Sequence, residues 1–181
     1  MKTYQFQELD TPALLIEESI LLDNIKSMQE LCNSNQIQLR PHIKTHKSIE
    51  LAKMQLKYGA VGISCAKVSE AIIFANAGFN NIQIANIIIG KHKFSKLLEL
   101  QEMVKNFSVC VDTLDNTKHI ESFFKEQNKG INVHILIDTG YHRCGMNDKD
   151  KILELAKYIN QSKQLNLIGI TTHAGQAYAV S

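Results

Sequence analysis

Residues 40–47 read Arg40-Pro41-His42-Ile43-Lys44-Thr45-His46-Lys47, a segment in which every second position is basic or a histidine. On a β-strand, successive side chains point to opposite faces. The even-numbered positions would then share one face, which consists of Arg40, His42, Lys44 and His46. If this face points into a barrel, Lys44 has neighbours that can perturb its pKa or bind an anionic cofactor. Such an environment is typical of a lysine that forms a Schiff base, so the segment predicts a cofactor site.

Other interpretations of this segment remain open. Clusters of Lys, Arg and His are often solvated faces or anion-binding patches. His42 and His46 have the i, i+4 spacing of two zinc ligands on a helix, but no Glu follows His42 and Pro41 disfavours a helix there. The chain carries a net charge of only +2 and has no Trp, which argues against nucleic-acid binding. We therefore expect no nucleic-acid partner and no defensible metal-ligand cluster among the histidines.

The composition is that of an ordinary globular protein. The chain has 181 residues, of which 44% are hydrophobic and 21% charged, enough apolar content for a core. No stretch is long and apolar enough for a transmembrane helix. Residues 1–8 lack the apolar segment and cleavage site of a signal peptide. These observations predict a cytoplasmic protein without a membrane partner.

The cysteines are widely spaced and form no Cys-x-x-Cys pair, which argues against a structural zinc site and a disulfide framework. They are Cys32, Cys65, Cys110 and Cys144. Cys65 and Cys110 lie in expected strands, where we predict buried thiols. Cys144 follows Arg143 in an expected turn, where a reactive thiolate is conceivable.

Strand-like and helix-like segments alternate along the chain. The expected strands are 37–45, 60–66, 82–88, 108–113, 131–138 and 165–173. The expected helices are 18–32, 48–58, 69–77, 94–105, 116–127 and 149–161. Short connections between alternating strands and helices indicate parallel strands with right-handed crossovers, hence an α/β fold.

Polar residues gather at the C-terminal ends of the expected strands, for example Lys44, Asp138 and His173. In a β/α barrel these ends meet around one site. The doubly wound alternative is disfavoured because no Gly-x-Gly-x-x-Gly follows the first strand. A closed barrel has eight strands and typically about 250 residues, whereas about six strands are expected here. We therefore predict an incomplete (β/α)8 TIM-type barrel in a truncated chain.

Several motifs resemble the D-serine dehydratase and D-threonine aldolase group of the alanine-racemase-like, fold type III pyridoxal-phosphate enzymes. The matching segments are 10–14, 39–47, 59–62, 84–86, 111–112, 137–145 and 172–178. Pro-His-x-Lys-Thr-His at 41–46 is the specific string, whereas Asp-x-Gly-x-x-Arg-x-Gly at 138–145 is shared with amino-acid racemases of the same fold. The resemblance implies that residues 1–181 form the N-terminal barrel domain of such an enzyme, truncated and without the C-terminal β-domain.

The resemblance also implies roles for individual residues. Lys44 corresponds to the lysine that forms the internal aldimine with pyridoxal 5′-phosphate and then acts as a base. Arg143 corresponds to an arginine near the phenolic oxygen of the cofactor, and His173 to a histidine against its pyridine ring. His42 and Tyr178 are further expected cofactor neighbours. The alternatives are a solvent-exposed loop charge for Arg143 and a core histidine for His173.

Three functions follow from the resemblance. The first is a lyase acting on small D-hydroxy-amino acids, of dehydratase or aldolase type. The second is an amino-acid racemase, and the third is a non-catalytic pyridoxal-phosphate-binding protein. Full-length members are expected to be homodimers with a divalent metal site and a phosphate loop, and neither the metal ligands nor the loop has a counterpart in this sequence. The chain alone is therefore expected to be weak or inactive.

Overall fold

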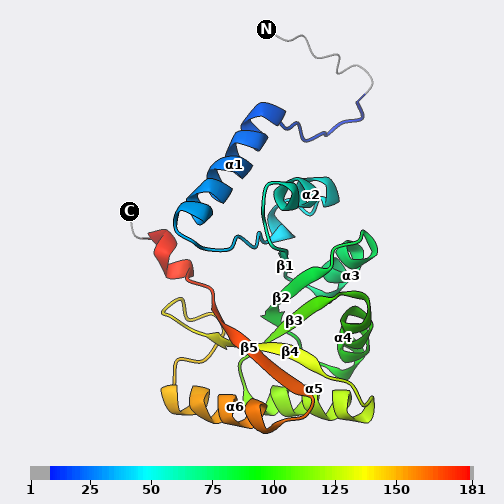
Figure 1. The fold of residues 1–181 in the computed structure, drawn as a ribbon, viewed down its shortest axis with the longest axis vertical. Coiled ribbons are helices and arrows are strands. Elements are labelled where there is room, and N and C mark those ends of the chain that lie inside the picture. Colours follow the sequence, from blue (N-terminus) through cyan, green and yellow to red (C-terminus); the bar gives the residue numbers. More distant parts are fainter. Residues whose placement is uncertain (1–8, 180–181) are drawn as a thin grey trace.

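The computed structural model describes residues 9–179 and shows one parallel sheet whose five strands adjoin in chain order (Figure 1). The strands are β1 (Ile63–Cys65), β2 (Asn81–Ile87), β3 (Asn106–Val111), β4 (Ile131–Ile137) and β5 (Leu165–Thr172). The α-helices are α1 (Glu18–Ser34), α2 (Ile49–Lys57), α3 (Val68–Asn76), α4 (Lys91–Met103), α5 (Leu114–Glu126) and α6 (Lys149–Gln161). Two short 3-10 helices are η1 (Ile43–Thr45) and η2 (Gly175–Ala179). The predicted α/β class is confirmed.

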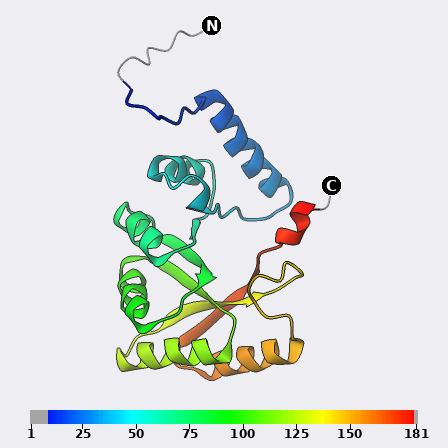
Figure 2. The same ribbon diagram turned by 180° about the vertical axis from the view of Figure 1, so that it is seen from behind.

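The two faces of the sheet differ because side chains alternate along each strand. On one face, Ile82, Ile84 and Val133 are fully buried and pack in one core with Phe94 of α4 and Phe124 of α5. Helices α3 to α6 wrap around this side of the curved sheet (Figures 1 and 2). The opposite face carries polar side chains, among them Ser64, Gln83, Asn132, His134 and Asn166. The alternation therefore divides the sheet into an apolar and a polar side.

Side chains that cap backbone N–H groups fix where several helices begin. Ser48 accepts a hydrogen bond from the Leu51 N–H at the start of α2. Thr113 accepts one from Asn116 at the start of α5, and Asp148 accepts two at the start of α6. The helices that these residues begin lie close to the segments expected from the periodicity.

The first expected strand, 37–45, is wrong as a regular strand. Only His42 bridges to the sheet, opposite Ser64, and the chain then turns into η1. Pro41 has no N–H to donate to a strand partner. His42 Nδ1 accepts a hydrogen bond from the Lys44 N–H at 3.2 Å, which turns the backbone out of the extended conformation. The four basic positions therefore do not share one strand face.

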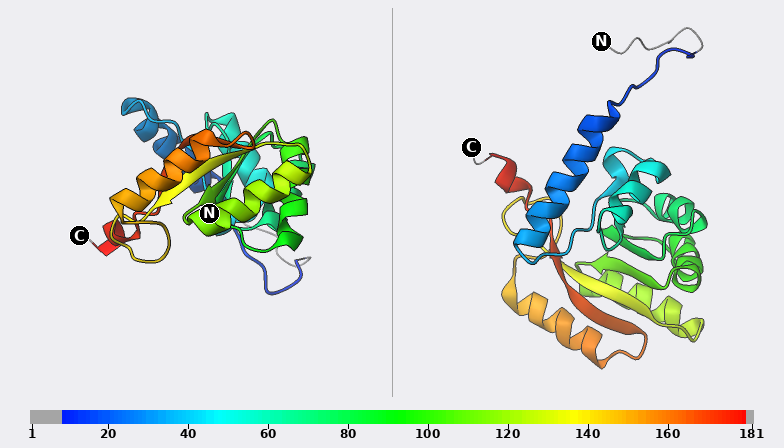
Figure 3. Two further views of the ribbon diagram at one scale, coloured as in Figure 1. Left: turned by 90° about the horizontal axis from the view of Figure 1, so that it is seen from below. Right: turned by 45° about the horizontal axis from the view of Figure 1, so that its top comes forward.

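Helix α1 extends away from the sheet and its helical cover (Figure 3). It buries only Ile25 and Gln29, whereas Ile20, Met28 and Leu31 are exposed. Within residues 9–179, no helix is long and apolar enough to cross a membrane. Residues 1–8, on which the expectation about a signal peptide rests, lie outside the described residues.

Candidate functional site

A cavity of about 200 Å³ opens at the C-terminal ends of the strands. Residues from six separate parts of the chain line it, including His42, Lys44, Ser64, Gln83, Arg143 and His173. His42, Lys44, Arg143 and Cys144 also line an adjoining hollow that reaches Asn86. Four of the five residues expected at a cofactor site thus meet in one place. The fifth, Tyr178, contacts His173 from outside the residues that line the cavity.

Lys44 reaches this cavity from η1. Ile43, directly before it, is fully buried in the core, and Lys44 is exposed on the cavity side. The bridge between His42 and Ser64 and the cap on the Lys44 N–H hold this turn against β1. The lysine is therefore presented by a fixed turn and not by a regular strand.

Arg40 and His46, which were expected beside Lys44, point elsewhere. Arg40 donates a hydrogen bond to Asn81 Oδ1 at 2.7 Å, at the start of β2. His46 accepts one from the Ser48 N–H and lines a separate hollow beneath α1. Among the described residues, the cationic and imidazole lining of the cavity comes from His42, Lys44, Arg143 and His173.

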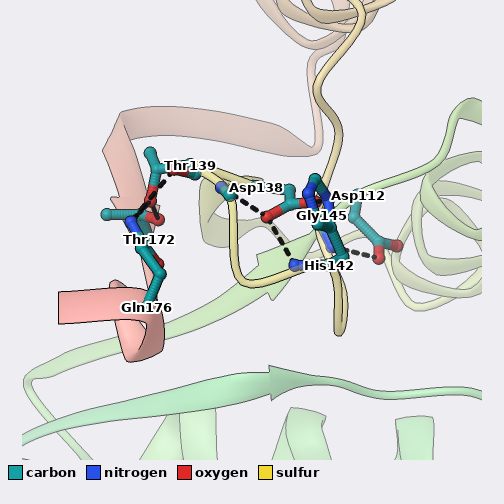
Figure 4. A network of polar contacts seen from close by, with 8 residues as sticks. Asp112, Asp138, Thr139, His142, Gly145, Thr172 and Gln176 are labelled. Atoms are coloured by element: carbon teal, nitrogen blue, oxygen red, sulfur yellow. Dashed lines mark hydrogen bonds and ion pairs between the residues drawn. The ribbon is translucent and has the colours of Figure 1, made fainter. Parts of the chain in front are cut away.

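The loop that carries Arg143 is organised by Asp138 at the end of β4 (Figure 4). One carboxylate oxygen accepts hydrogen bonds from the N–H groups of Gly140 and His142, at 2.9 and 3.0 Å. The other lies 2.9 Å from His142 Nδ1. These bonds, above all those from the backbone, lower the pKa of Asp138 to about 2. The aspartate of the Asp-x-Gly-x-x-Arg-x-Gly string is therefore a loop organiser.

Gly145 closes the same loop. Its φ of +96° lies in a region that favours glycine, and an added Cβ would lie 2.8 Å from the backbone nitrogen of Asp138. Its N–H donates to Asp112 Oδ2 at 3.3 Å, which ties the loop to the end of β3 (Figure 4). Met146 then returns to β4 through two backbone hydrogen bonds. The closed loop places Arg143 over the cavity.

Aromatic contacts surround His173, which follows β5. Its ring lies edge-on to Tyr141 at 5.2 Å and to Tyr178 at 6.1 Å. The Arg143 guanidinium lies 5.4 Å from the centre of the Tyr141 ring. The contacts thus connect the Arg143 loop to the segment that follows β5.

Polar contacts hold η2 against the Arg143 loop (Figure 4). Gln176 Nε2 donates to the carbonyl of Thr139 at 3.0 Å, and Thr139 Oγ1 lies 2.9 Å from Thr172 Oγ1. The ends of β4 and β5 are therefore joined beside the cavity.

Both cavity histidines favour the neutral form. Desolvation lowers the pKa of His42, and the charges of Lys44 and His173 lower it further, against an opposing effect of Glu70. Desolvation followed by the charges of Arg143 and Lys44 lowers the pKa of His173. The cavity therefore combines fixed positive charge with neutral imidazoles, a set that suits an anionic ligand with a flat ring.

Sequence reasoning missed several wall residues, among them the polar Ser64 and Gln83. Each is polar and stands between apolar residues of its strand. This alternation was the available signal, because it places both on the face opposite the core.

The cysteine predictions are confirmed for Cys65 and Cys110, which are buried. Burial raises the pKa of each thiol to about 12. Cys144, for which a reactive thiolate was only an alternative, lines the cavity. Across residues 9–179, no group of three His, Cys, Asp or Glu side chains is placed to hold a metal ion.

The sequence profile of the family described as "Alanine racemase, N-terminal domain" matches residues 16–181. The chain belongs to this family. D-threonine aldolase of Arthrobacter is 35% identical over 167 residues, which cover 92% of this chain and 44% of the aldolase. 3-Hydroxy-D-aspartate aldolase of Paracoccus denitrificans is 30% identical, covering 93% of this chain and 44% of that enzyme. The alanine-racemase-like chain thus spans less than half the length of these curated relatives.

A solved structure, D-threo-3-hydroxyaspartate dehydratase from Delftia sp. HT23, superposes with a TM-score of 0.88 at 33% identity. The match covers 95% of this chain and 45% of the dehydratase. The resemblance to the aldolase and dehydratase group is thereby confirmed, as is the alanine racemase N-terminal fold, represented here by five parallel strands. The predicted truncation of the domain and the absence of a C-terminal β-domain stay predictions.

Proposed function

We propose that the cavity binds pyridoxal 5′-phosphate and that the chain is the cofactor-binding part of a lyase acting on D-hydroxy-amino acids. One observation carries this proposal: Lys44, Arg143 and His173, which lie far apart in the sequence, line the same cavity. Pyridoxal phosphate needs an amine for its aldehyde carbon, positive charge for its anionic oxygens and a surface for its ring. These three side chains supply each of those needs.

When bound, pyridoxal phosphate withdraws electrons from the bond that breaks at the substrate α-carbon. Lys44 provides the amine that holds the aldehyde carbon, and it accepts a proton at Nζ once the substrate has displaced it. Its near partners are His42, Arg143 and His173 rather than Arg40 and His46.

Arg143 and His173 orient the bound ring. The Arg143 guanidinium provides charge-assisted hydrogen bonds to an anionic oxygen such as the phenolate. The neutral ring of His173, held by Tyr141 and Tyr178, offers a flat surface that shields one side of the ligand from water. His42 and Tyr178 complete the surroundings that we propose for the cofactor.

The proposed substrate class rests on the relatives, which include aldolases of D-threonine and 3-hydroxy-D-aspartate and dehydratases of related compounds. All of these names describe β-hydroxylated D-amino acids. A metal-free form of a D-threo-3-hydroxyaspartate dehydratase variant is among the similar structures, in line with a divalent metal in the full-length enzymes. We further propose a homodimer for full-length members of the group, as the resemblance implies, and a cytoplasmic location for this chain, as its sequence predicts.

A racemase is the second candidate, because an alanine racemase also matches 90% of this chain. Incubation with D-serine, D-threonine and D-alanine separates the candidates by their products. Pyruvate indicates a dehydratase, glycine with acetaldehyde an aldolase and L-alanine a racemase. A chain that binds the cofactor but forms none of these products is a binding protein, or a part that needs the remaining length of its relatives.

Cofactor binding itself is tested with Lys44→Ala. We expect wild-type chain to change the visible absorption of added pyridoxal phosphate, and Lys44→Ala to abolish this change because the amine is gone. Lys53→Ala, an exposed lysine of α2, is the matched control and should behave as wild type. An unaltered absorption change in Lys44→Ala would rule out the assignment.

A further inference from the structure

Three hydrogen-bonded side chains form a row across the polar face of the sheet. Ser64 Oγ donates to Gln83 Oε1 at 3.3 Å, and Gln83 Nε2 lies 3.4 Å from His134 Nδ1. The residues come from β1, β2 and β4. Ser64 and Gln83 line the cavity, whereas His134 lies behind them, outside the residues that form its wall. The row thus connects the cavity to a histidine that the proposed function does not use.

Small residues make room for this row. On β3, Ser108 is the register partner of Gln83, and Cys110 lies two residues further on the same face. The Gln83 side chain can therefore reach over β3 to β4. On β5, the partner of His134 is Gly169, and a Cβ there would lie 3.3 Å from the imidazole Cδ2. The imidazole occupies space that a larger residue at 169 would restrict.

The atoms of the row define its direction. Gln83 Oε1 can only accept a hydrogen bond, and Gln83 Nε2 can only donate one. With the Gln83 amide oriented so that Oε1 faces Ser64, His134 Nδ1 accepts from Nε2, and the neutral ring carries its proton on Nε2. Desolvation lowers the pKa of His134, and the charge of Arg40 lowers it further, which favours this neutral ring.

We propose that His134 is a positioning residue of the cofactor cavity, an inference that rests on the proposed function. By accepting a hydrogen bond from Gln83, it fixes the amide so that Oε1 takes the proton of the Ser64 hydroxyl. The oxygen of Ser64 is then left as an acceptor toward the cavity that Lys44 also lines. The other imidazole tautomer would reverse every bond of the row and make Ser64 a donor.

The tautomer is tested in the chain without any cofactor. NMR spectra of the 15N-labelled chain distinguish a protonated from an unprotonated ring nitrogen. We expect Nδ1 of His134 to be unprotonated, Nε2 to be protonated, and the Nδ1 signal to shift in Gln83→Leu, which removes the donor. A proton on Nδ1 would overturn the proposal, and this result does not depend on cofactor binding.

The effect on the cavity is tested by titration with pyridoxal phosphate. His134→Leu removes the acceptor for Gln83 Nε2, so we expect this variant to bind pyridoxal phosphate about tenfold more weakly than wild type. His134→Asn should restore most of the affinity, because its side-chain oxygen can accept from Gln83. Asn132→Leu is the matched control, since Asn132 lies two residues away on the same face of β4 and outside the cavity wall. Its affinity should equal that of wild type.

If His134→Leu and Asn132→Leu lose the same amount of pyridoxal-phosphate affinity, the effect belongs to the polar face in general and the role of His134 is overturned. Failure of His134→Asn to restore the affinity would overturn it as well. If His134→Leu does not fold, Gly169→Ala gives the same test, because its Cβ presses on the imidazole. If the wild-type chain binds no pyridoxal phosphate, the proposed function fails, while the ring-nitrogen spectra still decide the direction of the row.

Discussion

The helix-covered face of the sheet and its polar face are built from the same strands but differ in how their side chains are satisfied. On the covered face, residues such as Phe107 and Val109 are fully buried and contribute through packing alone. On the polar face, Gln83 and His134 need specific partners, because unpaired polar groups are costly there. We therefore expect substitutions on the covered face to change mainly the stability of the chain, and substitutions on the polar face to change mainly ligand binding.

Removing a buried side chain from the covered face should give the largest change in the free energy of unfolding. Phe124→Ala removes a fully buried ring of α5 and should lower the free energy of unfolding by about 3–5 kcal/mol. Asn166→Ala, at an exposed position of the polar face, should cost less than about 1 kcal/mol. Urea unfolding of both variants measures the contrast. Similar losses would mean that the two faces contribute alike to stability.

Gly145→Ala should affect stability and binding together. The backbone there has a positive φ, and the new Cβ would approach the Asp138 nitrogen, so we expect a loss of about 1–3 kcal/mol and weaker pyridoxal-phosphate binding. Gly78→Ala is the matched control, since its φ is +89° but nothing lies within 4 Å of the added Cβ. It should cost less and leave binding unchanged. Unchanged pyridoxal-phosphate binding in Gly145→Ala would show that the conformation of this loop does not matter for binding in the cavity.

A smaller, pH-dependent effect is expected from Asp138. Its pKa is lowered to about 2 in the folded chain from an ordinary value of 3.8. The stabilisation is therefore complete above pH 3.8 and is lost as the pH falls through about 2. The difference in unfolding free energy between wild type and Asp138→Asn should shrink over this window in urea titrations. A difference that stays constant down to pH 2 would show that the negative charge of Asp138 has no role.

The alternation of strands and helices was predictable because each strand has an apolar side that must meet the helices. The Asp138 to Gly145 loop was predictable as a motif, since its aspartate accepts hydrogen bonds from backbone N–H groups two and four residues away and its glycines have positive φ. Its attachment to Asp112 on another strand end was not predictable in this way. Arg143 and His173 could be expected at one site because each follows a strand, and parallel strands end on the same side. Lys44 was expected there from a strand that the structure does not form, and it reaches the site from η1 instead.

The turn at η1 was not predictable from the alternating pattern. It depends on the missing N–H of Pro41 and on a hydrogen bond from the Lys44 N–H to the side chain of His42. Arg40 is drawn away from the cavity by a partner distant in the sequence, Asn81. His46 is turned away locally, where its ring accepts a hydrogen bond from the Ser48 N–H. The row from Ser64 to His134 depends on the register between strands, which the sequence of one strand does not contain.

The central claim is that Lys44 is the lysine of a pyridoxal-phosphate cavity formed by the polar face. Reductive trapping tests it most directly: the chain is mixed with pyridoxal phosphate, treated with borohydride, digested and mapped by mass spectrometry. The account predicts that the pyridoxyl label lies on Lys44 and is lost when Arg143 is replaced by Leu at limiting cofactor. A label spread over exposed lysines such as Lys53, with none preferentially on Lys44, would contradict it.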